Sequence, residues 1–245
     1  MKKLILLMIV LVTVSVVSAQ TPSDFPYQHI IENVDFENLS ISGQIDVFIS
    51  QADVNTVEIR YLEPDRMQYV TVEQKNRTLS IITQGYAVGY YFIFVKKEWG
   101  KKFDSRIQVH VGMADIKHFN FGNNLNISYQ SDIKLGSITQ QVGYKGNLNT
   151  DNLLANEFNL YVGNNGTVSM GNLTLKNVKI TTNYKSRLDI KSISAETLNL
   201  NIGSNSIVKI DTLDTIKMTI RTGYQSQLVL ENTLTPTLST GEGEK

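Results

Sequence analysis

Cysteine is absent from the 245-residue chain, and neither sign of charge is in excess, because 23 Lys and Arg balance 23 Asp and Glu. The first absence excludes thiol nucleophiles, disulfide bonds and a lipid anchor on a mature N-terminal cysteine. The second removes the overall field that would indicate nucleic acid or an anionic membrane as a partner. We therefore expect a fold stabilised by burial and backbone pairing alone, with no nucleic-acid partner.

Motifs for catalysis and metal binding are missing as well. The three histidines, His29, His110 and His118, are scattered and lack the spacing of metal ligands. There is no nucleophile elbow, phosphate-binding loop or dinucleotide glycine pattern. The carboxylates of the later chain form no paired groove of the kind that glycoside-cleaving enzymes need. We predict a protein that is not an enzyme and has no cofactor or metal, with a polysaccharide-active β-helix enzyme as a distant alternative.

Long apolar runs are confined to the beginning of the chain. Lys2 and Lys3 precede the apolar residues 4–12, and the small residues Ser18 and Ala19 follow. This pattern predicts a signal peptide over residues 1–19, cleaved after Ala19. An uncleaved anchor is the alternative, although the run is short for a membrane span of about 20 residues. We expect an exported protein in the periplasm, on the outer cell surface or secreted, with no integral membrane span after cleavage.

A short polar phrase recurs at intervals of 21, 20, 20, 20 and 20 residues. Each copy is headed by a small residue: Gly122, Gly143, Gly163, Asn183, Gly203 and Gly223. Two sets of alternating apolar positions follow in each copy, starting for example at Leu148 and at Phe158, with a polar corner at Asn152 between them. Such alternation predicts strands with one buried face, and a copy of this kind must stack on its neighbours. The sequence therefore predicts an all-β fold, a right-handed parallel β-helix (β-solenoid) with ~20-residue half-repeats.

Two finer predictions concern the coil. Because Gly and Asn tolerate positive φ, the residue that heads each copy is expected to supply a left-handed bend. Copies 40 residues apart share six of twenty residues, whereas copies 20 apart share at most four, which favours a 40-residue coil over a 20-residue one. The longer coil would form one ladder from Tyr144, Tyr184 and Tyr224. Its opposite edge would carry Asn124, Asn165 and Asn205.

One domain is expected over residues 34–232, after a lead at 20–33 and before a flexible tail at 233–245. Residues 34–84 read as irregular capping strands, in which Ser42–Ile49 resembles a degenerate copy of the repeat, and 106–232 read as regular repeats. Residues 85–105 are an aromatic and basic insertion. One hypothesis is that its Tyr90, Phe92 and Trp99 contact a partner or surface, and the simpler alternative is that the aromatic rings pack on the solenoid.

Two short motifs carry a family resemblance. Phe36–Ile49 reads F-x-x-L-x-I-S-G-x-I-D-V-x-I, and Met113–Phe119 reads M-x-D-I-K-x-F. Together with the export signal and the ~20-residue repeats, they resemble bacterial proteins with a head GIN domain, the auto-transporter adhesin family. The resemblance covers about Val34 to Leu230, although the family's usual Ser-Gly-Ser-Gly corner is bulkier and more polar here. It implies a β-helical, non-enzymatic envelope or secreted protein of Bacteroidetes-like bacteria, and supplies no binding residues.

Two functions remain open. The first is an adhesin-like binding module whose repeated polar and aromatic corners contact a glycan or cell-surface ligand, because aromatic faces stack on sugars and Lys supplies donors. The candidate ligand-binding residues are Tyr144, Lys145, Tyr184, Lys185, Tyr224 and Gln225. Alternatively, these tyrosines only cover the corners and pack on one another. The second function is a structural or scaffolding cell-envelope protein that forms a homo-oligomer through the insertion or a free solenoid end.

Overall fold

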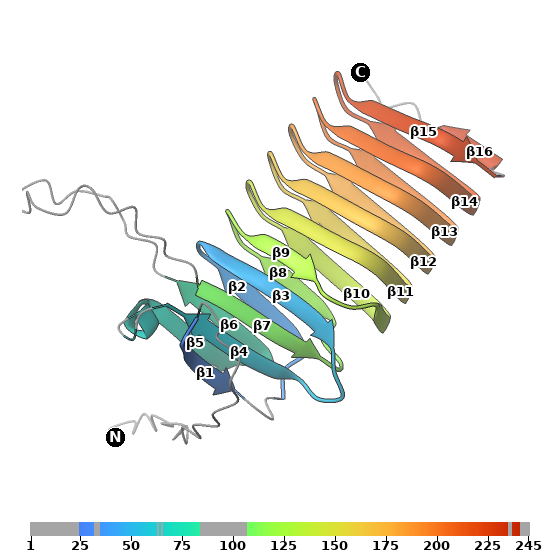
Figure 1. Ribbon diagram of the computed structural model, residues 1–245. Coiled ribbons are helices and arrows are strands. Elements are labelled where there is room, and N and C mark those ends of the chain that lie inside the picture. Colours follow the sequence, from blue (N-terminus) through green and yellow to red (C-terminus); the bar gives the residue numbers. More distant parts are fainter. Residues whose placement is uncertain are drawn as a thin grey trace, which may run out of the picture.

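The computed structural model describes residues 25–31, 35–62, 64, 66–83, 107–234 and 237–240. Over these residues the chain forms a right-handed parallel β-helix, in which strands stack along one axis (Figure 1). The predicted signal peptide, 1–19, lies outside the described residues. So does the insertion at 85–105 with Tyr90, Phe92 and Trp99.

Four long strands each follow almost one complete coil. They are β11 (Asn147–Val162), β12 (Thr167–Thr182), β13 (Arg187–Ile202) and β14 (Ile207–Thr222). Each pairs in parallel with the next at a shift of twenty residues, so that Leu148 lies beside Val168 and Val168 beside Leu188. One coil is therefore 20 residues long, and the 40-residue coil favoured by the sequence is wrong. The stronger similarity at 40 residues comes from the turns described below, whose residues alternate from coil to coil.

Inward and outward side chains alternate along each coil except at two bends. In β11, two consecutive residues are left unburied at 151–152 and again at 156–157, and the chain changes direction at both places. Each coil consequently has three sides. The alternating sets predicted for the first and third sides are buried, as Leu148 and Phe158 show. The short side between them, with Leu153 and Ala155 inward, was not predicted.

The lower coils do not follow chain order. β8 (His118–Phe121) and β9 (Asn126–Tyr129) stack on β2 (Asn38–Ser42) and β3 (Ile45–Gln51), and β10 (Ile133–Val142) joins this level to β11. Ile41 pairs with Phe121 and Val47 with Ile127, at a shift of eighty residues. The prediction that Ser42–Ile49 copies the repeat is confirmed by this register. The chain between β3 and β8 is thus an excursion between two stacked coils.

One further parallel layer lies beneath β2 and β3. It consists of β6 (Thr78–Thr83) under β2 and β7 (Ile107–Met113) under β3. Residues 84–106, which are not described, connect these strands at the point where the higher coils have a short turn. The aromatic insertion therefore interrupts the lowest coil at its turn position.

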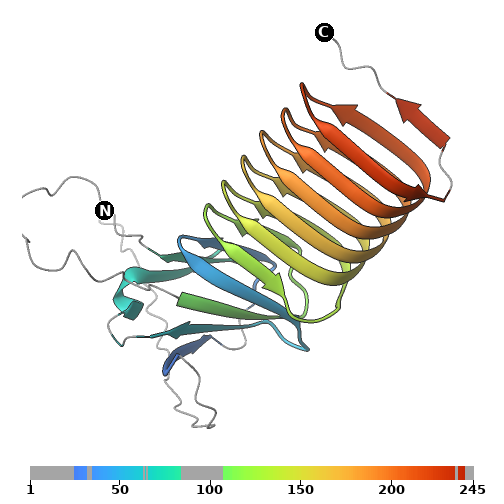
Figure 2. The ribbon, with the colours of Figure 1, turned by 45° about the horizontal axis from the view of Figure 1, so that its top comes forward.

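Antiparallel strands close the N-terminal end of the solenoid (Figure 2). β4 (Thr56–Tyr61) pairs with β7, β1 (Tyr27–Ile31) pairs with β4, and β5 (Val70–Lys75) pairs with β6. A short 3-10 helix, η1 (Arg66–Tyr69), leads into β5. The reversal of strand direction ends the parallel stack and covers its edge. The cap therefore consists of β1, β4 and β5, while β2 and β3 belong to the solenoid.

The C-terminal end has no comparable cap within the described residues. β15 (Gln227–Thr233) and β16 (Thr237–Thr240) each pair with β14 and with no further strand of the described chain. Val229 and Leu234 are exposed there. The two ends of the solenoid thus differ, since one is covered by antiparallel strands and the other presents an open strand edge.

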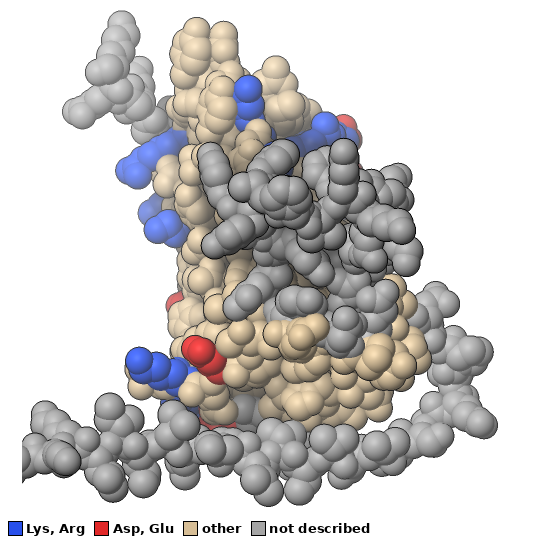
Figure 3. Space-filling view, turned by 90° about the vertical axis from the view of Figure 1, so that its left-hand side faces the viewer, with Lys and Arg blue, Asp and Glu red and all other residues tan. Residues whose placement is uncertain are grey.

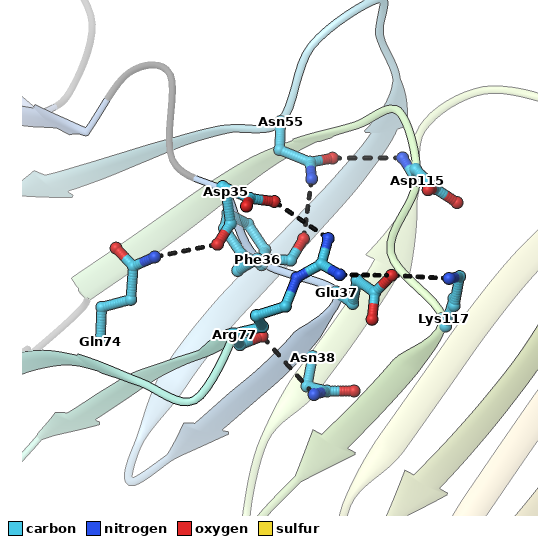
Figure 4. Close-up of polar contacts among 9 residues, drawn as sticks. All are labelled: Asp35, Phe36, Glu37, Asn38, Asn55, Gln74, Arg77, Asp115 and Lys117. Atoms are coloured by element: carbon cyan, nitrogen blue, oxygen red, sulfur yellow. Dashed lines mark hydrogen bonds and ion pairs between the residues drawn. The ribbon is translucent and has the colours of Figure 1, made fainter.

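A polar cluster fastens the cap at the edge where β2, β6 and β8 begin (Figure 4). Arg77, between β5 and β6, pairs with Asp35 at 3.1 Å and with Glu37 at 3.2 Å, and Lys117 reaches Glu37 at 2.6 Å. The hydrogen bond from Lys117 lowers the pKa of Glu37. Because Glu37, Arg77 and Lys117 immediately precede three stacked strands, the cluster holds the starts of those strands together.

Replacing Asn55 with Ala is expected to lower the free energy of unfolding by about 1–3 kcal/mol, since partly buried backbone groups would lose their partners. The Asn55 side chain donates to the carbonyl of Phe36 at 3.0 Å and accepts the N–H groups of Ala114 at 2.9 Å and Asp115 at 3.3 Å. Urea denaturation measures the effect. Asn149→Ala, at an exposed position, is the matched control and should change stability by less than about 0.5 kcal/mol. An equal loss in both variants would contradict a fastening role for Asn55.

Candidate functional site

All coils above residue 121 turn at the same edge of the solenoid through four residues. These turns begin at Gly122, Gly143, Gly163, Asn183, Gly203 and Gly223, and we call the row the turn edge (Figure 2). Where the turns close by a backbone hydrogen bond, the fourth residue donates to the first, as Gly146 does to Gly143 at 3.2 Å. The sequence repeat therefore marks a column of stacked turns.

The third residue of each turn has positive φ, between 52° and 59°. These residues are Asn124, Lys145, Asn165, Lys185, Asn205 and Gln225. Positive φ at the third position alone is characteristic of a type II turn. The prediction that the leading Gly or Asn supplies the left-handed bend is thus wrong. The leading residue is small because stacked turns lie close together: a Cβ on Gly143 would lie 2.5 Å from the carbonyl oxygen of Gly122.

Backbone hydrogen bonds connect each turn to the next. The N–H of the third residue donates to the carbonyl of the second residue of the turn above, from Asn124 to Tyr144 at 2.9 Å and from Asn165 to Tyr184 at 3.0 Å. The intervening turns continue the series, with Lys145 donating to Asn164 at 3.1 Å. The turn edge is therefore a hydrogen-bonded row with the spacing of a sheet, about 4.8 Å per coil.

The second residue alternates between short and aromatic along the row. In order it is Asn123, Tyr144, Asn164, Tyr184, Ser204 and Tyr224. Each Asn side chain lies against the turn above, where Asn123 Oδ1 accepts the N–H of Tyr144 at 2.8 Å and Asn164 Oδ1 accepts that of Tyr184 at 3.2 Å. The alternation has a physical reason, because the short residue satisfies the backbone of the turn that carries the tyrosine.

The three tyrosines project from the turn edge into solvent. Tyr144 and Tyr184 are each 42% exposed, and Tyr224 is 73% exposed. The Nζ of Lys145 lies 5.2 Å from the ring centre of Tyr144, and that of Lys185 lies 5.0 Å from the ring centre of Tyr184, both within cation–π range. Gln225 takes the place of the lysine in the third of these turns. The predicted binding residues are therefore brought together on one surface as three aromatic and polar pairs.

The tyrosines do not form the ladder that the sequence suggested. They stand on alternate coils, which places successive rings about 9.6 Å apart, and no contact between them occurs in the described structure. The expectation that Asn124, Asn165 and Asn205 lie on the opposite edge is also wrong, because they are the third residues of the intervening turns on this same edge. The alternative that the rings pack on one another does not hold.

Charge and metal-binding groups on this part of the molecule are sparse. Figure 3, which faces the side from which the turns project, shows scattered Lys and Arg side chains and few Asp or Glu. In the described ranges no three His, Asp or Glu side chains are grouped so as to hold a metal ion. Nor does any helix of the described chain have the length and apolar character of a membrane span. Aromatic faces, ammonium groups and amides are the chemistry that the turn edge offers.

Similarity to known proteins covers most of the chain. The family model described as "Putative auto-transporter adhesin, head GIN domain" matches residues 35–224. No curated protein matches. A solved structure of a putative adhesin from Bacteroides fragilis has a TM-score of 0.53 and 12% identity, over 86% of this chain and 96% of that one. A putative adhesin from Parabacteroides distasonis has the same TM-score and coverage at 15% identity. These two likenesses concern the fold.

Proposed function

Because the chain belongs to the head GIN domain family of putative auto-transporter adhesins, we propose that it is an exported, non-enzymatic binding module whose turn edge contacts a glycan or another cell-surface ligand. The periplasm, the outer cell surface and the extracellular medium are the compartments compatible with this role. Residues of the turn edge supply the contacts, and the solenoid serves as a rigid support.

The observation that carries the proposal is the arrangement of Tyr144, Tyr184 and Tyr224. Three exposed rings at equal spacing on a rigid row are costly to leave in water unless they meet a partner, and rigid aromatic anchors lose little entropy on binding. The pairs of Tyr144 with Lys145 and of Tyr184 with Lys185 add a charged donor beside the ring. A sugar ring could stack on the aromatic face while its hydroxyls bond to the ammonium group and to the neighbouring amides.

A scaffolding role is the second candidate, and it rests on a different observation. The open strand edge of β15 and β16 exposes Val229 and Leu234, and an unpaired edge can pair with another chain. A homo-oligomer formed at this end would be an envelope scaffold without a ligand on the turn edge. Concentration-dependent sedimentation of the mature chain distinguishes this role from ligand binding.

The binding proposal is tested with the mature protein, residues 20–245, on a glycan array, followed by calorimetric titration of any glycan that binds. The variant Y144A/Y184A/Y224A should bind at least about ten-fold more weakly, because an aromatic contact at a binding hot spot contributes more than 1 kcal/mol. Its melting temperature should stay close to that of the wild type, because all three rings are exposed and none packs on another.

The matched control replaces three exposed apolar side chains away from the turn edge, as V54A/L154A/I216A. It should retain full affinity. A glycan whose affinity falls equally in both triple variants, or in neither, would place binding elsewhere on the protein. A loss of melting temperature confined to the tyrosine variant would instead identify the rings as structural.

A further inference from the structure

A shallow hollow of about 270 Å³ lies on the outer face of the third side, across β12, β13 and β14. Its lining consists of Lys179, Asn199, Leu200, Asn201, Thr219 and Arg221. Leu200 contributes from the buried core layer, and the other five residues point outward from the sheet. Neither the family match nor the turn edge involves this hollow in binding.

The hollow follows from the register of the strands. Lys179, Asn199 and Thr219 occupy one column, and Asn201 and Arg221 stand side by side in the next column. Long side chains therefore flank short ones, with Lys179 on the first coil and Arg221 on the third. The asparagines and the threonine form a polar floor between two cationic walls.

The two cations are free to bind an anion. Neither Lys179 nor Arg221 has an ion-pair partner in the described chain, and the lining contains no carboxylate. Cations on the first side of neighbouring coils behave differently, since Arg187 pairs with Asp189 at 2.7 Å and Lys209 with Asp211 at 2.9 Å. Two strand spacings across and two residues along place Lys179 and Arg221 roughly 12 Å apart at Cα, close enough for both side chains to reach one group held above the floor.

The floor chemistry indicates what accompanies the negative charge. Asn199 and Asn201 each offer amide donors and a carbonyl acceptor, and Thr219 offers a hydroxyl, which together match the hydroxyls of a sugar. The Arg221 guanidinium can bind a carboxylate or sulfate through two parallel hydrogen bonds. The lining is too polar to favour an acyl chain.

We infer that this hollow binds an acidic saccharide, with the carboxylate or sulfate between Lys179 and Arg221 and the sugar hydroxyls on Asn199, Asn201 and Thr219. This inference rests on the proposed glycan-binding function and names the ligand class. The hollow adjoins the turn edge, because Asn201 and Arg221 lie two residues before Gly203 and Gly223. A chain of sugars seated in the hollow can therefore continue toward Tyr184 and Tyr224.

The test is calorimetric titration of the mature protein with an oligogalacturonate, its neutral methyl ester and a sulfated oligosaccharide. One of the two acidic sugars should bind, and the galacturonate ester should bind at least about ten-fold more weakly than the acid if the acid is the ligand. K179Q/R221Q should weaken acidic-sugar binding by about ten-fold or more. The control K134Q/K191Q, which removes the same charge from exposed lysines outside the hollow, should bind as the wild type does.

The results separate this inference from the proposed function. Acidic-sugar binding that survives Y144A/Y184A/Y224A but is lost in K179Q/R221Q supports the hollow and argues against the turn edge. Neutral-glycan binding that depends on the tyrosines and ignores K179Q/R221Q supports the turn edge and overturns the inference. Failure of both acidic sugars to bind, equal loss in both charge variants, or equal affinity for an oligoglutamate also overturns it.

Discussion

Replacing Phe158 with Ala is expected to lower the free energy of unfolding by about 3–5 kcal/mol, the range for deleting a buried aromatic ring. Phe158 is fully buried in the interior of the coil formed by β11. It lies between Ile138 of the coil below and Val178 of the coil above. Because both neighbours are fixed by continuous backbone ladders, the coils cannot close over the lost ring, and a cavity remains.

Urea denaturation followed by circular dichroism measures this loss, and the next residue provides the control. Asn159 faces outward, and its side chain makes a single long contact with Thr139 Oγ1 at 3.5 Å. Asn159→Ala should therefore change stability by no more than about 0.5 kcal/mol. If Phe158→Ala cost less than about 1 kcal/mol, the interior would be far more deformable than a close-packed core allows.

Replacing Gly43 with Ala should cost about 2–4 kcal/mol, because backbone strain and crowding act together. Gly43 turns the chain from β2 into β3 with φ of 113°, a conformation that side chains rarely adopt. A Cβ there would lie 1.8 Å from Thr83 Oγ1 and 2.9 Å from the Thr83 carbonyl oxygen. The measurement is again the urea midpoint and slope.

Gly136→Ala is the matched control for Gly43→Ala. No atom lies within 4 Å of a Cβ built on Gly136, and its φ is not positive, so the change should be neutral or stabilising by about 0.4–1 kcal/mol. The double variant G43A/T83A separates the two causes. It should recover only part of the loss, since removing the Thr83 hydroxyl relieves crowding and leaves the strained φ. Complete recovery would show that crowding alone was responsible.

The sequence predicted the core of this fold well, because burial acts on each strand locally. Alternation placed Leu148 and Phe158 on the inside without knowledge of their neighbours. The short side of the coil was missed because Leu153 and Ala155 supply only two inward positions, too few to show a period. The length of the coil was missed for another reason. Similarity between copies reports which side chains stand on the turns, whereas coil length is set by which backbones pair.

The turn edge was predicted in part. Its residues were identified from the repeat, but the left-handed bend was assigned to the wrong position, since Gly143 is required by the close approach of Gly122 and positive φ is met by Lys145. The hollow between Lys179 and Arg221 could not be predicted in the same way. It depends on side-chain lengths in two adjacent columns, which become visible only after the shift of twenty residues is known.

The difference between a 20-residue coil and a 40-residue alternation restricts how such a protein can change in length. Duplication of a single coil would place a tyrosine turn directly on another and remove the short residue that accepts the N–H of the upper one, as Asn123 does for Tyr144. Duplication of two coils preserves every such contact and adds one exposed ring. Growth by gene duplication would therefore proceed in pairs of coils, and the number of pairs would set the valency of the turn edge.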